Sequence, residues 1–265
     1  MRTALTIAGS DSGGGAGIQA DLKTFSAMGV FGTSAITAVT AQNTVLVTAV
    51  HALPASLVAA QIDAVVSDIG ADATKIGMLA DAAIVDEVAS AIVRHRLERV
   101  VLDTVMVSKG GATLIDPAAV AMMSLLLPLA AVATPNVPEA ETLTGRSIRT
   151  AEDQREAARR LVDLGARAVV IKGGHLDGPA VDVFFDGQAW HEWTHPRIPG
   201  RHTHGTGCTF SAAIAARLAL GDDLFSAIGR AKAYVSGAIL HAPGLGRGHG
   251  PLDHFWERTH GGGPA

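Results

Sequence analysis

Short apolar segments alternate with longer amphipathic segments along most of the chain. Runs rich in Val, Ile, Leu and Ala predict strands at residues 3–8, 34–41, 73–78, 99–103, 131–134 and 167–172. Apolar residues at helical spacing predict helices at residues 18–28, 54–66, 81–95, 116–127, 151–164, 206–220 and 222–241. This alternation is typical of a parallel sheet covered by helices on both faces.

The pattern changes after residue 180. Segments 181–186 and 188–194 have strand composition, and the Asp186-Gly187 pair between them is typical of a hairpin turn. We therefore predict a doubly wound α/β fold, with a mostly parallel central sheet flanked by helices and a small antiparallel edge.

A chain of 265 residues with 48% hydrophobic content can bury one large core. No internal repeat or linker divides it, so we expect a single domain over residues 1–265, with the last ~10 residues as a flexible tail. Segment 245–265 is rich in Gly and His and has no HExxH or Cys/His ligand spacing. We expect its histidines to lie on the surface.

Charge and cysteine content exclude several classes of partner. The net charge is −4 and no Lys/Arg cluster stands out, so nucleic acid is not expected as a partner. The single cysteine cannot form an intrachain disulfide, and the N-terminus lacks a signal segment, so we expect a cytoplasmic protein. The apolar run 118–129 is interrupted by Ser124 and Pro128, so no membrane span is expected.

A glycine-containing segment at residues 203–209 leads from a loop into an Ala- and Leu-rich helix. Gly205 and Gly207 leave the backbone unobstructed, and the helix is expected to begin between Thr206 and Thr209. The first N–H groups of a helix have no partner within the helix and lie at the positive end of its dipole. The segment therefore predicts a cradle for a phosphate or a transferring phosphoryl group.

Cys208 lies at the start of this helix. A thiol in that place, with His202 and His204 just before it, is expected to have a lowered pKa, which would let Cys208 take a proton from a nucleophile. The alternative is that Cys208 is a small buried hydrophobe, as many cysteines are.

A second glycine-rich loop, residues 9–17, follows the first predicted strand. It departs from the dinucleotide fingerprint because Ile18 stands where the third glycine should be, and no Walker loop is completed. The loop indicates close approach of the backbone to some ligand. Asp21 lies in the first turn of the next helix, where the dipole favours an acid, and Gln42 ends the next strand, at the sheet edge where open parallel sheets bind ligands.

Polar and charged residues also follow later strands. Asp103 ends an apolar strand, where a buried carboxylate is costly unless it serves a metal, a cation or hydrogen-bond donors. Asn136 and Glu139 precede a helix, and their simplest interpretation is a capping box. Lys172 ends a strand beside two glycines, which suits phosphate contact, although lysines more commonly reach the surface.

Seven segments, taken in order, resemble the hydroxymethylpyrimidine/phosphomethylpyrimidine kinases of thiamine biosynthesis, in the ribokinase-like superfamily. They are AGSD with GGGAGIQAD at residues 8–21, TAQNT at 40–44, TKIGML at 74–79, VLDTVM at 101–106, TPNVPEA at 134–140, KGGH at 172–175 and THGTGC at 203–208. Sugar kinases of this superfamily usually carry aspartate at the position of Cys208, so the cysteine is informative.

The resemblance implies a ribokinase-like fold and an ATP- and magnesium-dependent enzyme. Such an enzyme phosphorylates the hydroxymethyl group of 4-amino-5-hydroxymethyl-2-methylpyrimidine and then converts the monophosphate to the diphosphate. ATP would be the co-substrate, Mg²⁺ the cofactor and a homodimer the expected assembly.

Residues of the matching motifs take roles from the resemblance. The pyrimidine pocket would be lined by Gly9, Asp21, Gln42, Met78 and Val105, with Gln42 and Asp21 as hydrogen-bonding groups. ATP and its phosphates would be bound by Lys172, Asn136, Thr203 and Thr206, and the metal by Asp103 and Glu139. Phosphoryl transfer would be carried by Gly205, Thr206, Gly207 and Cys208.

Cys208 would act as base in the first phosphorylation only. The alcohol must lose a proton on attack, whereas the monophosphate is already an anion at neutral pH.

Three other functions are weighed against this one. A pyridoxal or pyridoxine kinase of the same superfamily is the nearest alternative, because that ring also carries a hydroxymethyl arm. A catalytically silent ligand-binding homologue is a second alternative. A dinucleotide oxidoreductase is disfavoured by the imperfect glycine loop.

Overall fold

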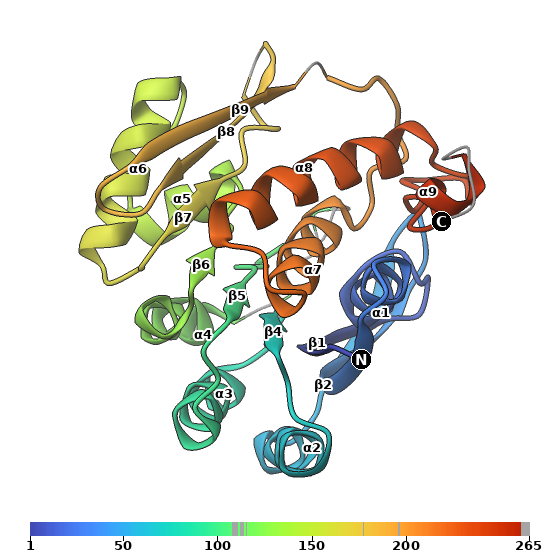
Figure 1. Ribbon diagram of the computed structural model, residues 1–265, viewed down its shortest axis with the longest axis vertical. Helices are drawn as coiled ribbons and strands as arrows, with labels where there is room; N and C mark the ends of the chain where they lie inside the picture. Colours follow the sequence, from blue (N-terminus) through green and yellow to red (C-terminus); the bar gives the residue numbers. More distant parts are fainter. Residues whose placement is uncertain (108–110, 112–113, 115, 177, 196, 261–265) are drawn as a thin grey trace.

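The computed structural model describes residues 1–107, 111, 114, 116–176, 178–195 and 197–260. All of its described strands belong to one sheet, in the order β3-β2-β1-β4-β5-β6-β7-β8-β9 (Figure 1). The strands are β1 Thr3–Asp11, β2 Phe31–Gln42, β3 Val47–Ala52, β4 Ala73–Ile76, β5 Val100–Leu102, β6 Val132–Ala133, β7 Val169–Ile171, β8 Ala180–Phe185 and β9 Trp190–His195.

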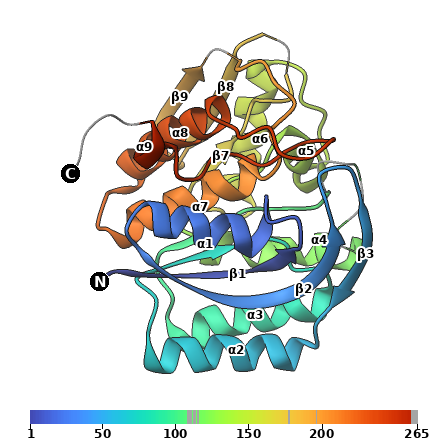
Figure 2. The ribbon, with the colours of Figure 1, turned by 90° about the vertical axis from the view of Figure 1, so that its right-hand side faces the viewer.

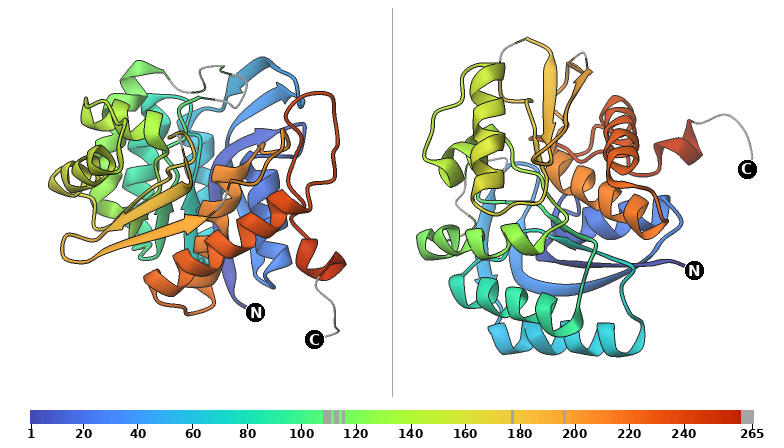
Figure 3. Two further views of the ribbon diagram at one scale, coloured as in Figure 1. Left: turned by 90° about the horizontal axis from the view of Figure 1, so that it is seen from above. Right: turned by 60° about the vertical axis from the view of Figure 1, so that its left-hand side comes forward.

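The six strands β2, β1, β4, β5, β6 and β7, which are neighbours in this order in the sheet, run parallel, as the alternating sequence pattern predicted. Strands β8 and β9 run antiparallel, and their hairpin stands beside α6 (Ala151–Asp163), which Figure 3 shows. The sheet has a second antiparallel edge at β3, which pairs with β2 and which the sequence analysis did not predict. The doubly wound class is thus confirmed, with antiparallel strands at both ends.

The remaining α-helices, in chain order, are α1 Gly17–Ala27, α2 Ala55–Asp68, α3 Ala82–His95, α4 Pro117–Met122, α5 Val137–Thr144, α7 Thr206–Ala219, α8 Leu224–Leu240 and α9 Trp256–Thr259. The helix predicted at 116–127 ends early at Met122 and continues as two short 3₁₀ turns, the second of which contains Pro128. Proline lacks the backbone N–H that a continuing α-helix needs.

Two apolar layers hold the sheet between helices. One side of the sheet packs on α2 through α6, and the other side packs on α1, α7 and α8. Figure 2 shows α2 and α3 on one side of β1 and β2, with α1 and α7 on the other side. Successive residues of a strand point to opposite faces, so Leu5 and Ile7 of β1 join the first layer while Ala4 joins the second. Thr6 and its cross-strand partner Lys75 are buried polar residues in the middle of the sheet.

The C-terminal segment differs in part from the predicted tail. Its histidines were expected on the surface, and His249 and His260 are exposed, but His254 is only 3% exposed. His254 is buried because its ring bonds Thr209 of α7 at 3.1 Å, while Tyr234 donates to its carbonyl oxygen. Within the predicted flexible tail, α9 is helical, and residues 261–265 lie outside the described residues.

Within the described ranges, no helix is long and apolar enough to cross a membrane.

Candidate active site

The candidate residues follow successive parallel strands. Met78 follows β4, Asp103 follows β5, Asn136 follows β6 and Lys172 follows β7. Because these strands are parallel neighbours, their carboxyl ends meet at one edge of the sheet, where α/β folds of this type bind ligands.

A row of buried charges crosses this edge. The side chain of Lys75 has no exposed surface, and its Nζ lies 2.9 Å from Asp21 Oδ2 and 4.0 Å from Asp103 Oδ2. Lys172 Nζ lies 3.0 Å from Asp103 Oδ1 on the far side. The charges therefore alternate in the order Asp21, Lys75, Asp103, Lys172.

Lys75 had been given no role in the sequence analysis, although it stood within the TKIGML motif. Burial lowers the pKa of a lysine, but the negative charges of Asp21 and Asp103 together raise the pKa of Lys75 above its ordinary value. The residue is an ammonium surrounded by acids. A lysine inside an apolar strand was the available signal, because a buried ammonium requires counter-charges.

Asp21 holds this ammonium from within α1. Its Oδ2 accepts from Thr6 Oγ1 at 2.6 Å and from Lys75, whereas its Oδ1 has no hydrogen-bond partner among the described residues. Asp103 Oδ2 is likewise buried and accepts no hydrogen bond from the described part of the chain. Two carboxylate oxygens therefore remain available to a ligand, a metal or water.

Helix α7 begins at Thr206, within the predicted range. Gly205 caps it with a φ of 80°, and a Cβ at this position would overlap the carbonyl oxygen of Gly15. The two glycine loops are therefore in direct backbone contact, which only glycine permits here. Thr206 Oγ1 donates to the Thr203 carbonyl oxygen at 2.8 Å and fixes the turn.

The start of α7 faces the Lys172–Asp103 pair. A Cβ at Gly207 would lie 3.3 Å from Lys172 Nζ and 3.8 Å from Asp103 Oδ1. The first turn of α7, a lysine and a carboxylate thus converge where an anion can approach closely. Burial lowers the pKa of Lys172, but Asp103 and Glu139 outweigh this effect and raise it overall.

The expectation for the Cys208 pKa was wrong. Burial raises the pKa of the thiol to about 12, and the positive charge of Lys75 offsets only part of this effect. The negative charge of Asp103 raises the pKa of Cys208 further. His204 Nε2 lies 2.8 Å from the Asp11 carboxylate. Neither the helix N-terminus nor the histidines therefore lower the pKa of Cys208 overall. Cys208 is a thiol at neutral pH in this structure.

Asn136 and Glu139 form the predicted capping box at the start of α5. The Glu139 N–H donates to Asn136 Oδ1 at 3.0 Å, and the Asn136 N–H donates to Glu139 Oε2 at 2.9 Å. Thr104 Oγ1 also donates to Glu139 Oε2, at 3.0 Å. Burial raises the pKa of Glu139 to about 6, against the influence of Lys172. Glu139 can therefore cap α5 and at the same time interact with the charged groups of Lys172 and Asp103.

A second cluster joins the two glycine loops through Asp11, which the sequence analysis did not single out. Its carboxylate accepts from the backbone N–H groups of Gly13, Gly15 and Ala16 at 2.8–3.1 Å. His204 Nε2 lies 2.8 Å from the same carboxylate. Burial acts to raise the pKa of Asp11, but these hydrogen bonds lower it overall.

Gln42 belongs to this second cluster. Its Nε2 lies 3.2 Å from His204 Nε2, and its Oε1 lies 3.2 Å from Thr40 Oγ1. Within the described part of the chain, its side-chain hydrogen bonds do not reach Asp21, Met78 or Val105.

The other members of the predicted pocket lie near the strand ends. A Cβ at Gly9 would lie 3.2 Å from Met78 Sδ, so Gly9 and Met78 are neighbours. Val105 is half-buried and donates its N–H to the Asp103 carbonyl oxygen.

The C-terminal segment contacts the loop that follows β2 and the loop that leads into α7. The His249 N–H donates to the Thr44 carbonyl oxygen at 2.8 Å, and a Cβ at Gly248 would overlap that oxygen. The His204 N–H donates to the Gly250 carbonyl oxygen at 3.1 Å. Residues near the end of the chain thus connect the loop after β2 with the start of α7.

Comparison with known proteins identifies the family. The sequence profile of the family described as phosphomethylpyrimidine kinase matches residues 11–253. The chain belongs to this kinase family.

Relatives of this family member are similar over nearly its whole length. The chain is 52% identical over 255 residues to the hydroxymethylpyrimidine/phosphomethylpyrimidine kinase of Bacillus subtilis, covering 95% of this chain and 94% of the relative. It is 56% identical over 253 residues to the thiamine biosynthesis bifunctional protein ThiED of Geobacter sulfurreducens, covering 95% of this chain. The chain spans only 52% of that longer protein.

A solved structure supports the fold of this family member. An ADP complex of Bacillus subtilis pyridoxal kinase superposes with a TM-score of 0.91 at 41% identity, covering 98% of this chain and 100% of the other. The predicted ribokinase-like architecture is confirmed.

The donor set of this family member suits a magnesium ion bound together with phosphates. Among the residues that the structure describes, no group of three His, Cys, Asp or Glu residues could hold a metal ion by itself. Mg²⁺ commonly takes one or two carboxylates and completes its shell with waters and substrate phosphates. Asp103 Oδ2, which accepts no hydrogen bond from the described residues, and the nearby Glu139 fit that requirement.

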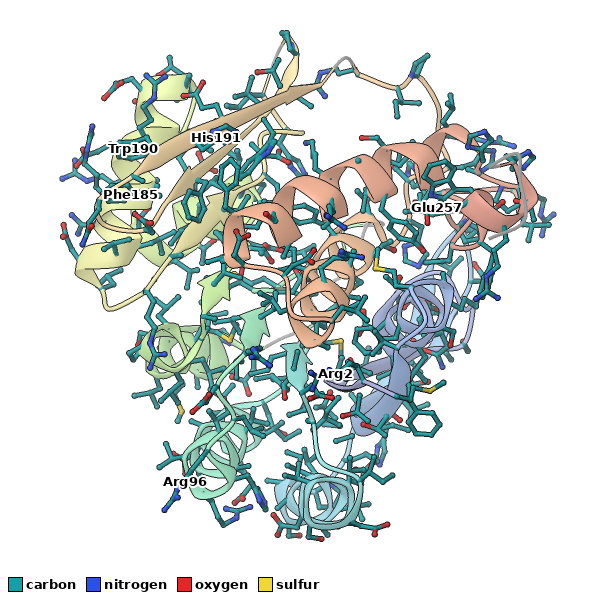
Figure 4. The ribbon with its side chains drawn as sticks, viewed as in Figure 1. Arg2, Arg96, Phe185, Trp190, His191 and Glu257 are labelled. Atoms are coloured by element: carbon teal, nitrogen blue, oxygen red, sulfur yellow. The ribbon has the colours of Figure 1, made fainter. Side chains whose placement is uncertain are left out.

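A surface hollow lies away from this edge. It is lined by residues of α3 and of the segments that precede β5, β6 and β7, including Arg96, Leu129 and Arg167. Figure 4 labels Arg96, at the end of α3. The hollow therefore lies at the amino ends of these strands, whereas the charged row follows their carboxyl ends.

Proposed function

We propose that this family member phosphorylates 4-amino-5-hydroxymethyl-2-methylpyrimidine with ATP, and then phosphorylates the monophosphate to the diphosphate, in thiamine biosynthesis. The observation that carries the proposal is the start of α7 facing the Lys172–Asp103 pair, a site built for a transferring phosphoryl group. The Bacillus subtilis relative, 52% identical, bears the name of this activity.

Phosphates are bound by the start of α7 and the residues around it. The N–H groups of residues 205–208 and the Lys172 ammonium receive the negative charge, while Thr203, Thr206 and Asn136 contact the ATP phosphates. Asp103 and Glu139 would hold Mg²⁺, and the ion would supply positive charge that neutralises the phosphates. Phosphoryl transfer depends mainly on such positioning and charge stabilisation.

The pyrimidine is bound at the carboxyl ends of the strands, by residues of β1 and β2 and of the loops that follow β4 and β5. Met78 and Val105 supply apolar faces, and Gly9 leaves room for the ring. Gln42 pairs with the aminopyrimidine edge, where a ring nitrogen accepts and the amine donates. Asp21 contributes through its free Oδ1 and through Lys75.

Cys208 acts in the first phosphorylation, where the alcohol must lose a proton. The thiol has first to give up its own proton, and Lys75 and Lys172 are the cations that favour the thiolate. Cys208→Ala should therefore slow the first step at least about tenfold more than the second. Equal loss in both steps would assign Cys208 to positioning.

A second candidate function is phosphorylation of pyridoxal, because the Bacillus subtilis pyridoxal kinase shares this fold at 41% identity. The deciding experiment offers ATP and Mg²⁺ with the hydroxymethylpyrimidine, its monophosphate or pyridoxal, and identifies products by mass. Mono- and diphosphorylated pyrimidine would support the first proposal. Phosphorylated pyridoxal alone would favour the second, and no product from any substrate would favour a silent binding protein.

A single domain, a homodimeric state, a cytoplasmic location and the lack of nucleic-acid and membrane partners stay predictions from the sequence. Size-exclusion chromatography with light scattering tests the dimer.

A further inference from the structure

The Gln42 amide lies next to a ring nitrogen whose protonation is fixed by its other neighbour. The Asp11 carboxylate is only an acceptor, and it already receives three backbone N–H groups of the 13–16 loop. His204 Nε2 lies 2.8 Å from this carboxylate, in a residue that is 8% exposed. Two acceptors cannot approach this closely, so Nε2 carries a hydrogen and donates it to Asp11.

A protonated Nε2 also determines which end of the amide faces His204. The Gln42 amide nitrogen lies 3.2 Å from it, and two donors facing each other make no hydrogen bond. The other end has a matching conflict, because Thr40 Oγ1 lies 3.0 Å from the Ser10 carbonyl oxygen and 3.2 Å from Gln42 Oε1. In this orientation the single hydroxyl hydrogen of Thr40 is divided between the two oxygens, and the hydroxyl accepts no hydrogen bond from the amide.

A half-turn of the amide removes the contact between two donors. Its oxygen then shares the one Nε2 hydrogen of His204 with the Asp11 carboxylate, its NH₂ donates to Thr40 Oγ1, and Thr40 donates to Ser10. Amide nitrogen and oxygen are distinguished by such networks. One N–H and one oxygen lone pair of Gln42 remain for a ligand.

We propose that His204, held by Asp11, is a positioning residue that fixes the Gln42 amide in this orientation and thereby selects the pyrimidine edge that the site accepts. The proposal rests on the proposed function, in which Gln42 pairs with that edge. A 4-amino edge presents a ring acceptor beside an amine donor, and a 4-oxo edge presents the reverse order. An amide that cannot turn accepts one order and leaves the other with unpaired groups.

The test compares the 4-amino substrate with its 4-oxo analogue in the native protein and in His204→Phe. We expect the native kcat/KM to favour the amino compound by at least about 100-fold, and His204→Phe to reduce this preference by about 10-fold or more. Equal loss on both compounds, or an unchanged ratio, would overturn the proposal, because a purely structural role lowers both activities together.

A second variant acts at the other end of the amide. Thr40→Val removes the hydroxyl while keeping the shape of a residue that is 5% exposed, and it should also relax the amino-to-oxo ratio. Thr33→Val is the matched control on the same strand, because Thr33 Oγ1 bonds the Ala4 carbonyl oxygen instead. A Thr40→Val ratio equal to that of the control would count against the proposal.

A spectroscopic measurement separates this proposal from the proposed function. Imidazole ¹⁵N–¹H correlation of the native protein, with His204 assigned by its loss in His204→Phe, should show the hydrogen on Nε2. An unprotonated Nε2 overturns the proposal whatever the activity. If native protein phosphorylates neither pyrimidine while Nε2 is protonated, the proposed function fails, and with it the selective role, but the amide orientation stands.

Discussion

Removing the ammonium of Lys75 should destabilise the fold, because the buried carboxylate of Asp21 then loses its positive partner. Lys75→Met keeps an unbranched side chain of similar length in a position without exposed surface. Asp21, also without exposed surface, then keeps Thr6 as its remaining donor among the described residues. Breaking a buried ion pair on one side costs about 3–5 kcal/mol of unfolding free energy. For a domain of this size the Tm should fall by roughly 6–20 °C.

A double variant distinguishes charge from packing. Asp21→Asn added to Lys75→Met removes the uncompensated carboxylate, so the double variant should recover to within about 2 kcal/mol of the native protein. Urea unfolding followed by circular dichroism measures all three proteins. Arg155→Met is the control, because the Arg155–Glu192 pair is exposed to solvent and should contribute far less to the unfolding free energy than the buried pair.

The pH dependence gives an independent check. Burial already raises the pKa of Asp21, and loss of Lys75 raises it further. Folded Lys75→Met therefore binds a proton that the unfolded chain releases, so its stability relative to the native protein should fall as pH rises from 5 to 8. A single variant within about 1 kcal/mol of native, or a double variant less stable than the single, would refute the reasoning.

Three further outcomes follow from the site. Gly205→Ala should lower kcat/KM at least about 100-fold without changing the circular dichroism spectrum. The reason is that the φ of 80° at Gly205 and the nearby Gly15 carbonyl oxygen leave no room for a Cβ. A kcat/KM within tenfold of the native value would contradict this. Burial lowers the pKa of His254 to about 4, below its unfolded value, so stability should decline by about 3 kcal/mol as pH falls from 6.5 to 4, and His254→Phe should flatten that decline in urea titrations. The pKa of Glu139 is raised to about 6, so the carboxylate is largely protonated at pH 5.5. The apparent Mg²⁺ affinity in the kinase assay should therefore fall about fourfold from pH 7.5 to 5.5 in the native protein but not in Glu139→Gln. If the Mg²⁺ affinity of both proteins changed equally with pH, Glu139 would not be a metal ligand.

Features set by local pattern were predictable from the sequence. Strand ends in a parallel sheet share one edge, so Asp103 and Lys172 could be expected near each other, and they are 3.0 Å apart. The start of α7 followed from Gly205 and the Ala-rich run after it. The capping box of Asn136 and Glu139 followed from their spacing.

Features set by the packing of distant segments were not predictable. Asp11 and His204 are 193 residues apart in the sequence, and only the folded chain places them 2.8 Å from each other. The pKa of Cys208 depends on desolvation by the surrounding layers, which outweighs the local influence of the helix terminus. Strand β3 was missed because four of its six residues are exposed, so it carries little of the apolar pattern that marks a buried strand.

The C-terminal segment contacts the loops that follow the first strands, and this affects how the chain folds during translation. Gly15 and Thr44 are synthesised early, whereas the backbone groups that contact them, at Gly205 and at residues 248–249, emerge some two hundred residues later. Phe25 of α1 similarly waits for α7 to cover it. A nascent chain therefore exposes apolar surface and lacks the phosphate-binding start of α7 until translation is nearly finished. Contacts between segments so far apart in the sequence slow folding, and the exposed apolar surface can bind chaperones.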